Sequence, residues 1–245
     1  MNLLIFEGDE LLGRRLILSG RRARHLLKVL RVEPGHTVRV GMVNGPVGSG
    51  LVITLGANTV TLEVTLEQKP VCDLHVELIL ALPRPIMLQR ILKQATVLGV
   101  RRFYLIRSRR VEKSFFQSPV LAAEKIRELL VEGMEQGMDT WLPEVSIHKQ
   151  FKPFAQEVLP QVEGTGIIAH PRVETPLAGL DVPGKERKPL LLAVGPEGGW
   201  NDFELDMFAD QGFIPFTMGN RILHVDTATV ALLAQLQLLY DLQNL

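Results

Sequence analysis

Short apolar runs alternate with amphipathic stretches through the C-terminal two thirds of the sequence, and this alternation constrains the fold most. Runs such as LHVELILAL (74–82) and PLLLAVG (189–195) are typical of strands buried on both faces. Strands and helices that take turns predict an α/β fold, with a mostly parallel sheet covered by helices. We expect strands at 74–82, 103–108, 144–148, 164–170, 189–195 and 213–219, and helices at 85–98, 118–136, 153–162, 201–212 and in a last segment ending at Tyr240.

The first 71 residues follow a different pattern. They contain short strand-like stretches with period-two alternation, as in TVTLEVTLE (59–67), and turn signals at Asn44-Gly45 and at 56–58. This predicts a small antiparallel barrel, interrupted by one or two helical turns over ARHLLKVLRV (23–32) with Leu26, Leu27 and Leu30 on one face. The pattern changes after Lys69-Pro70, so we predict one domain over 1–71 and a second over 72–245.

Basic residues are clustered although the net charge is zero. Seven lysines and arginines lie between Arg14 and Arg31 without a carboxylate, and a second cluster between Arg101 and Lys113 contains only Glu112 as an acid. Two such clusters favour contact with nucleic-acid phosphates, although a solvated surface balanced by acids elsewhere is the alternative. The candidate residues for this contact with RNA or DNA are Arg21, Arg22, Arg24, Lys28, Arg31, Arg109 and Arg110.

Other features of the sequence exclude several classes of protein. No apolar run reaches the length of about 18 residues that a membrane span needs, and the first residues lack the pattern of a secretory signal, so we expect a cytoplasmic protein. The single Cys72 excludes an internal disulfide and reads as a small core residue. The six histidines are scattered without the spacing of a zinc site, so we expect no metal.

A glycine-rich loop, Gly195-Pro196-Glu197-Gly198-Gly199, follows the predicted strand at 189–195. It lacks the Gly-Lys-Ser/Thr of a Walker loop and the glycine spacing of a dinucleotide fingerprint. Glycines permit positive φ and let a ligand lie against the backbone, which favours a ligand-binding loop. The alternative is that the glycines only form the turn between a strand and a helix. Asn201 is expected to cap the following helix, with Glu204 as its capping-box partner.

Two further predicted strands are followed by segments in the same position as the glycine-rich loop, directly after a strand. The segment MGNRILHVDTA (218–228) again joins a strand to a helix, with Asp226 or Thr227 as the expected N-cap, and the strand at 164–170 ends in IAHP. Ligands of parallel sheets bind beyond the carboxyl ends of the strands. The three strand ends therefore predict one composite pocket.

The pairing of GPEGGW with MGNRILHVDTA resembles the SPOUT class of S-adenosylmethionine-dependent RNA methyltransferases, and within it the RsmE family. The resemblance covers essentially the whole chain, including HLLKVLR, GMEQ, LPEV and IAHP. It implies methylation of N3 of a uridine in small-subunit ribosomal RNA, a PUA-like N-terminal barrel, a C-terminal trefoil knot and a homodimer formed through the knotted domain. The cofactor site carried over from the family comprises Ile168, Ala169, His170, Val194, Gly195, Pro196, Glu197, Gly198, Gly199, Met218, Gly219, Ile222, Leu223 and Thr227.

Methylation of uracil N3 requires loss of the imide proton and alignment of the nitrogen with a positively charged sulfonium. The candidate catalytic residues are Arg221, His224, Glu197 and Gln136. Arg221 either stabilises the developing anion or grips a phosphate, or instead forms a salt bridge that holds its loop. Glu197 reads as a loop anchor or cofactor acceptor, and His224 as a proton acceptor or as a simple loop contact.

The sequence departs from the family pattern where arginines are expected, because His224 and Asp139 stand in their places. Asp226 also replaces the usual glutamate. These departures keep two alternatives open. One is an RNA-binding or ribosome-assembly protein that retains the knot but is catalytically impaired, and the other is a methyltransferase for a different RNA position.

Overall fold

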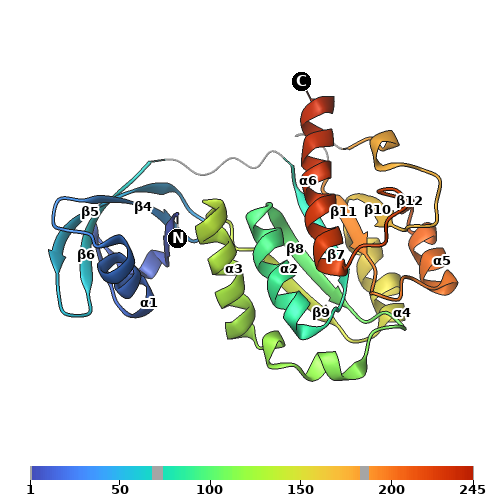
Figure 1. The fold of residues 1–245 in the computed structure, drawn as a ribbon, viewed down its shortest axis with the longest axis horizontal. Coiled ribbons are helices and arrows are strands. Elements are labelled where there is room, and N and C mark those ends of the chain that lie inside the picture. Colours follow the sequence, from blue (N-terminus) through green and yellow to red (C-terminus); the bar gives the residue numbers. More distant parts are fainter. Residues whose placement is uncertain (1, 68–73, 183–187, 245) are drawn as a thin grey trace. The chain divides into compact units, whose positions relative to one another are not determined.

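The computed structural model describes residues 2–67, 74–182 and 188–244. The chain forms two compact units, Met1–Val71 with Val131–Leu142, and Cys72–Leu130 with Pro143–Leu245 (Figure 1). The first unit thus adds a segment from the middle of the chain to the predicted residues 1–71, and the domain boundary at 71/72 stays a prediction. Cys72, expected in the core, lies outside the described residues.

The first unit contains a six-stranded sheet in the order β1-β4-β5-β6-β3-β2. Its neighbouring strands are antiparallel except for the parallel pair β1 and β4. The sheet is curled, and its strand order leaves β1 and β2 as edges, so the predicted barrel is a half-barrel among the described residues (Figure 1). The strands are β1 (Leu4–Phe6), β2 (Leu11–Leu12), β3 (Arg15–Leu18), β4 (Thr37–Met42), β5 (Val47–Leu55) and β6 (Val60–Leu66).

The predicted helical turns form α1 (Gly20–Arg24), which continues into a π-helical turn over His25–Leu30. Leu26 is buried, but Leu30 is exposed, so the expectation that Leu30 shares the buried face is wrong. The reason is the wider π turn, whose i to i+5 hydrogen bonds rotate later side chains away from the face that an α-helix would present. The turn ends at Arg31 in the left-handed conformation, with φ of 49°.

The segment Val131–Leu142 completes the core of the first unit. It begins within α3 (Ala123–Gly137), where Met134 is fully buried and packs with Leu3 and Ile5. Beyond the helix, the backbone N–H of Asn44 donates to the carbonyl of Thr140 at 2.7 Å. Asn44 has the positive φ expected of the Asn-Gly turn signal, so this turn is confirmed and is held by the second segment.

The second unit contains a six-stranded sheet in the order β12-β10-β11-β7-β8-β9, in which every neighbouring pair is parallel. This confirms the predicted α/β fold. Helices α2 (Pro85–Val97) and α6 (Val225–Gln243) lie side by side over one face of the sheet (Figure 1). The strands are β7 (Val76–Ala81), β8 (Val100–Ile106), β9 (Glu144–His148), β10 (Thr165–Ala169), β11 (Leu190–Val194) and β12 (Ile214–Phe216).

Shorter helices connect these strands. The predicted helix at 118–136 is a 3-10 turn followed by α3, and that at 153–162 is divided into α4 (Phe151–Pro153) and two turns, Phe154–Val158 and Leu159–Gln161. Helix α5 (Asp202–Asp210) matches the expected helix after the glycine loop. Pro119–Leu121 is the 3-10 turn before α3, and the remaining 3-10 turns are Gly8–Glu10, Lys113–Gln117 and Leu177–Gly179.

The start of α6 differs from the prediction. Its N-cap is His224, whose side chain forms no cap hydrogen bond, rather than Asp226 or Thr227. The Asp226 carboxylate instead accepts from Arg90 at 3.3 Å and from the backbone N–H of Thr227 at 3.0 Å. The Asp226 carboxylate, which the sequence pattern predicted to cap α6, therefore forms an ion pair with Arg90 of α2 instead.

In the part of the chain that the structure describes, no helix has the length and apolar character required to cross a membrane. The strand order does not test for the trefoil knot, which stays a prediction.

Candidate functional site

A cavity of about 490 Å³ opens where β10, β11 and β12 end. These three strands are neighbours in the parallel sheet, so their carboxyl ends meet at one edge. The loops that follow them line the cavity together with α6, and Leu205, Phe216 and Leu232 give it an apolar lining. Its volume suits a ligand of nucleoside size.

Most of the predicted cofactor residues lie together around this cavity. They contribute from all three strand ends, as the parallel arrangement predicts. Those that line the cavity are Ala169, His170, Val194, Gly195, Pro196, Glu197, Gly198, Gly199, Met218, Gly219, Ile222 and Leu223, with Arg221 beside them.

Four predicted site residues do not line the cavity. Ile168 is buried within β10, whereas Thr227 and His224 are exposed at the start of α6. Gln136 belongs to the first unit, near the end of α3, where its backbone carbonyl accepts from Asn2 at 3.1 Å. The roles of these four residues stay predictions.

The glycine loop has the backbone geometry that its sequence indicates. Gly199 has φ of +73°, and its N–H donates to the carbonyl of Pro196 at 2.8 Å, which closes a tight turn. The expected capping box is confirmed, because Asn201 Oδ1 accepts from the N–H of Glu204 at 2.9 Å and Glu204 Oε2 accepts from the N–H of Asn201 at 3.1 Å. The loop is therefore fixed at its junction with α5.

The close approach of Trp200 explains why residue 195 is a glycine. A Cβ at this position would lie 2.9 Å from Trp200 Nε1 and 3.0 Å from Trp200 Cε2. The indole is only 5% exposed and packs edge-on against Phe208, with ring centroids 5.2 Å apart. Its Nε1–H is buried and lacks an acceptor among the described residues.

Two arginines hold the glycine loop from outside. Arg84, the N-cap of α2, lies 3.4 Å from Glu197. Arg110 donates through Nη1 to the carbonyls of Gly198, Gly199 and Trp200. The sequence indicated neither contact, because Arg84 and Arg110 both lie far along the chain from the loop residues that they contact. Arg110, predicted to bind RNA, thus has its guanidinium engaged with the loop.

The segment that follows β12 is open to solvent. Gly219 has φ of +111°, and its N–H donates to Thr217 Oγ1 at 3.1 Å. Ile222 is 87% exposed, and Arg221 is exposed as well. Among the described residues Arg221 forms no ion pair, so the salt bridge considered as its structural role is not present there. Its guanidinium is free to bind a ligand.

The cavity contains one histidine with a shifted pKa. Burial, reinforced by the positive charge of Arg172, lowers the pKa of His170 below 6.5. The ring Nδ1 accepts from the backbone N–H of Arg172 at 3.2 Å, which requires that nitrogen to be unprotonated. His170 is therefore neutral at neutral pH and adds no positive charge to the cavity.

Protonation of partly buried histidines is expected to destabilise the fold in mild acid. Burial lowers the pKa of His25, His148 and His170 below 6.5, so the unfolded chain binds more protons than the folded chain as the pH falls below 6.5. The free energy of unfolding should therefore be lower at about pH 5.5 than at about pH 7.5. Urea titrations at both pH values measure this difference, and an equal or higher midpoint at the lower pH would contradict it.

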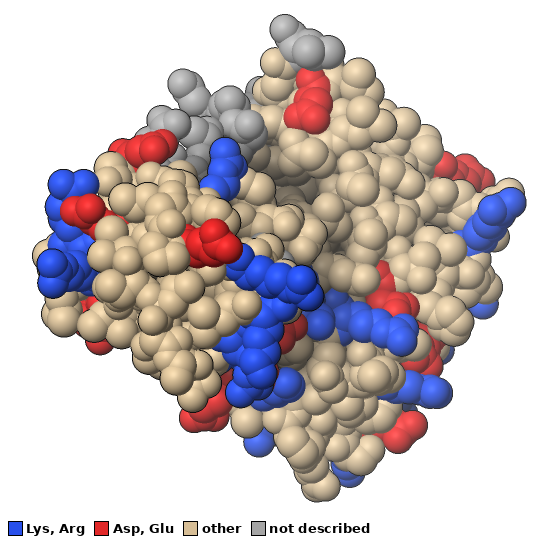
Figure 2. Space-filling model, turned by 60° about the vertical axis from the view of Figure 1, so that its left-hand side comes forward, with Lys and Arg blue, Asp and Glu red and all other residues tan. Residues whose placement is uncertain are grey.

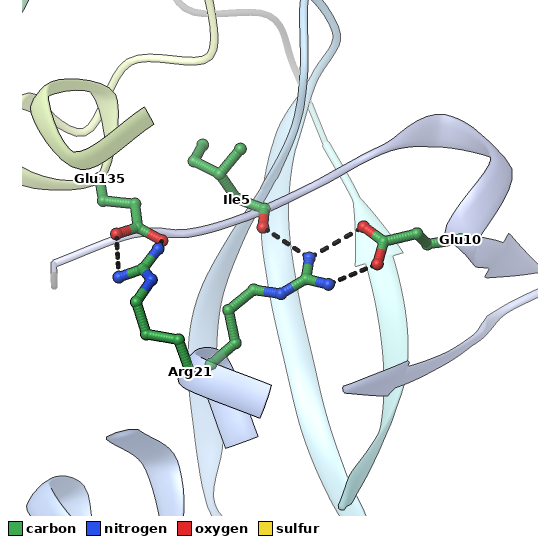
Figure 3. A network of polar contacts seen from close by, with 5 residues as sticks. Ile5, Glu10, Arg21 and Glu135 are labelled. Atoms are coloured by element: carbon green, nitrogen blue, oxygen red, sulfur yellow. Dashed lines mark hydrogen bonds and ion pairs between the residues drawn. The ribbon is translucent and has the colours of Figure 1, made fainter. Parts of the chain in front are cut away.

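In the first unit, two of the predicted RNA-binding arginines are engaged in ion pairs (Figure 3). Arg21 forms a two-pronged pair with the buried carboxylate of Glu135, at 2.9 and 3.0 Å. Arg22 donates to both oxygens of Glu10 and, at 3.1 Å, to the carbonyl of Ile5. The hydrogen bond from Arg22 lowers the pKa of Glu10 below 4.5.

The other predicted RNA-binding residues of the first unit, Arg24, Lys28 and Arg31, are exposed. Their side chains form no hydrogen bond or ion pair within the described ranges. Figure 2 shows lysine and arginine side chains gathered into patches on one face, with acidic side chains beside some of them. Three of the predicted RNA-binding residues of the first unit are thus available on the surface.

Comparisons with known proteins match the chain to RNA methyltransferases in sequence and in fold. The family described as "RNA methyltransferase domain" matches residues 70–237. The ribosomal RNA small subunit methyltransferase E of Treponema pallidum is 29% identical over 239 residues, covering 94% of this chain and 88% of that protein. The protein of the same name from Synechocystis is 27% identical over 243 residues, covering 97% and 78%. The crystal structure of ribosomal RNA small subunit methyltransferase E from Neisseria gonorrhoeae bound to S-adenosyl methionine has a TM-score of 0.79 at 23% identity, covering 97% of this chain and 98% of that chain.

Proposed function

The chain belongs to the RNA methyltransferase domain family, and we propose that it transfers a methyl group from S-adenosylmethionine to N3 of a uridine in small-subunit ribosomal RNA. The observation that carries this proposal is the cavity at the ends of β10, β11 and β12, lined by the GPEGG loop and by residues 218–223. The names of the relatives support ribosomal RNA as the substrate.

The cavity fits the cofactor in size and in chemistry. Gly195 lets the loop backbone lie directly against the buried Trp200, and the apolar lining of the cavity suits an adenine ring. The backbone of residues 194–199 and 218–223 would hold the nucleoside and the methionine portion. When bound, S-adenosylmethionine supplies an electrophilic methyl group on a positively charged sulfur. Because His170 is neutral at neutral pH, it does not repel the positively charged sulfur of the cofactor.

The reaction requires groups that act on the uracil ring. A base would take the proton from N3 of the uracil. The bond between the methyl carbon and the sulfur of S-adenosylmethionine would break as a bond between that carbon and N3 forms. Arg221 is suited to stabilise the negative charge that develops on the uracil, because its guanidinium is exposed at the cavity and unpaired among the described residues. Glu197 serves as a loop anchor in this scheme, since it is paired with Arg84. His224 remains the candidate base, and Gln136 remains a candidate catalytic residue whose role is not assigned.

A transfer assay tests this function. Purified protein is incubated with isotope-labelled S-adenosylmethionine and small ribosomal subunits that lack the modification, and the nucleosides are then analysed by mass spectrometry. We expect label in N3-methyluridine at one position. Label in another nucleoside would replace the proposed target, and cofactor binding without transfer would favour an RNA-binding or assembly protein, the alternative raised by His224 and Asp139.

We also propose a cytoplasmic homodimer formed through the second unit. Helix α6 carries Leu238 and Leu242, which are 58% and 60% exposed in the single chain. Large apolar side chains repeated at i and i+4 on one helix favour a covering partner. Light scattering coupled to size-exclusion chromatography measures the mass, and a monomer at about 10 μM, far above the dissociation constants of stable dimers, would contradict the proposal.

A further inference from the structure

A second cavity, of about 590 Å³, lies within the second unit near the ends of β8 and β9. Three segments line it, namely 107–109 after β8, 149–152 after β9, and 201–204 at the start of α5. It shares only Asn201 and Asp202 with the first cavity, so the two cavities lie on either side of the start of α5. The proposed methyl transfer makes no use of it.

The second cavity is basic. Within the described residues, the side chains of its four cationic residues form no hydrogen bond or ion pair, unlike those of Arg21, Arg22 and Arg110. Two carboxylates also line the cavity, so four cations face two acids. Glu204 is buried and accepts from the N–H groups of Asn201 and Arg109, at 3.1 and 2.7 Å, whereas Asp202 is exposed. The four residues are Arg107, Arg109, Lys149 and Lys152.

Aromatic rings lie beside these cations. Phe203 is 53% exposed and meets the half-buried Phe151 edge-on, with ring centroids 6.3 Å apart. Both rings line the cavity. The neighbouring Ser108 is buried, and its hydroxyl has no partner among the described residues. Unpaired cations next to an exposed aromatic ring are the combination by which proteins bind single-stranded RNA, with phosphates held by charge and a base stacked on the ring.

We infer that this second cavity binds a single-stranded segment of the RNA substrate, with a phosphate held by Arg107, Arg109, Lys149 and Lys152 and a base stacked on Phe203. The inference rests on the proposed function for the identity of the RNA. S-adenosylmethionine carries no phosphate, so these cations are not required by the cofactor. Because the cavities share Asn201 and Asp202, the nucleotide bound here would lie close in space to the one that is methylated.

The charge is tested with the double variant Lys149→Gln/Lys152→Gln. RNA affinity is measured by fluorescence anisotropy with a labelled small-subunit ribosomal RNA fragment over a range of salt concentrations. Loss of two phosphate contacts should reduce the slope of log K against log salt by about 1.4, the value for a single strand, and weaken binding roughly tenfold or more at about 0.1 M salt. The matched control, Lys125→Gln/Lys188→Gln, removes the same charge from exposed lysines of the same unit that form surface ion pairs.

The stacking is tested with Phe203→Ala. We expect RNA binding to weaken about fivefold or more with an unchanged salt slope, because a stacked base contributes at least about 1 kcal/mol. Ile86→Ala, which shortens an apolar side chain that is 59% exposed on α2, is the control. Cofactor affinity, measured by calorimetry, should be unchanged in all four variants.

The outcomes separate this inference from the proposed function. If the lysine and Phe203 variants bind RNA like their controls while the wild type transfers methyl groups, the cavity assignment is wrong and the function stands. If the wild type transfers no methyl group but the variants lose RNA binding as expected, the function fails and the cavity assignment stands. Binding of inorganic phosphate that is lost in the lysine variant, with RNA affinity unchanged, would assign the cavity to a free anion and overturn the inference.

Discussion

A Gly195→Val variant is expected to bind S-adenosylmethionine at least about 100-fold more weakly than the wild type, a cost of about 2.7 kcal/mol. Already a Cβ at residue 195 would approach three atoms of the Trp200 indole at 2.9 to 3.2 Å, and valine adds two methyl groups. The indole cannot yield easily, because it is buried against Phe208. The displaced atoms must therefore enter the cavity or move the loop. Isothermal titration calorimetry with the cofactor measures the loss.

The control for this variant is Gly179→Val. A Cβ at residue 179 meets only Pro176, at 3.9 Å, which is an ordinary contact. It should leave cofactor affinity unchanged, and circular dichroism should show that both variants are folded. A Gly195→Val protein that is folded and binds the cofactor like the wild type would mean that the cofactor lies elsewhere.

The Arg221→Gln variant is expected to reduce kcat for methyl transfer about 100-fold, while the cofactor Kd changes less than about threefold. The guanidinium has no partner among the described residues, so its removal breaks no ion pair there and should not destabilise the fold. Glutamine retains donors but loses the positive charge that would oppose the charge developing on uracil. Single-turnover measurements with saturating RNA and cofactor separate this effect from weaker binding.

The Arg221→Lys variant distinguishes a charge effect from a geometric one. Lysine keeps the charge but lacks the planar fork, so we expect partial recovery of kcat relative to Arg221→Gln. If Arg221→Gln turns over at the wild-type rate, Arg221 takes no part in the reaction. If it instead raises only the KM for RNA, Arg221 is a phosphate contact.

Periodicity and turn chemistry were sufficient to predict the strands of the second unit. Every strand there was predicted, since strands buried on both faces give continuous apolar runs such as LLLAV in β11. The GPEGG loop and the Asn201–Glu204 capping box were also predictable, because glycine, proline and capping residues act through local backbone geometry. With the strands parallel, the gathering of three strand ends around one cavity followed.

Contacts between distant segments were not predictable. Arg21, Arg22 and Arg110 read as free cations, yet each has partners that only the fold brings near, namely Glu135, Glu10 and the carbonyls after Gly198. A charge pattern reports local composition and does not indicate which charges are paired. The same reason applies to the second cavity, whose cations come from two loops about 40 residues apart, between Arg109 and Lys149.

The placement of Val131–Leu142 in the first unit has a consequence for biosynthesis. The N-terminal sheet contacts Met134, Glu135 and Thr140 in the finished structure, and these residues are translated long after β6. Domains generally fold as units during synthesis, at about 5–20 residues per second. Leu3 and Ile5 of the nascent half-barrel are therefore not covered by Met134 until several seconds after β6 has been translated. During that interval these side chains are available to chaperones that bind apolar segments on the ribosome.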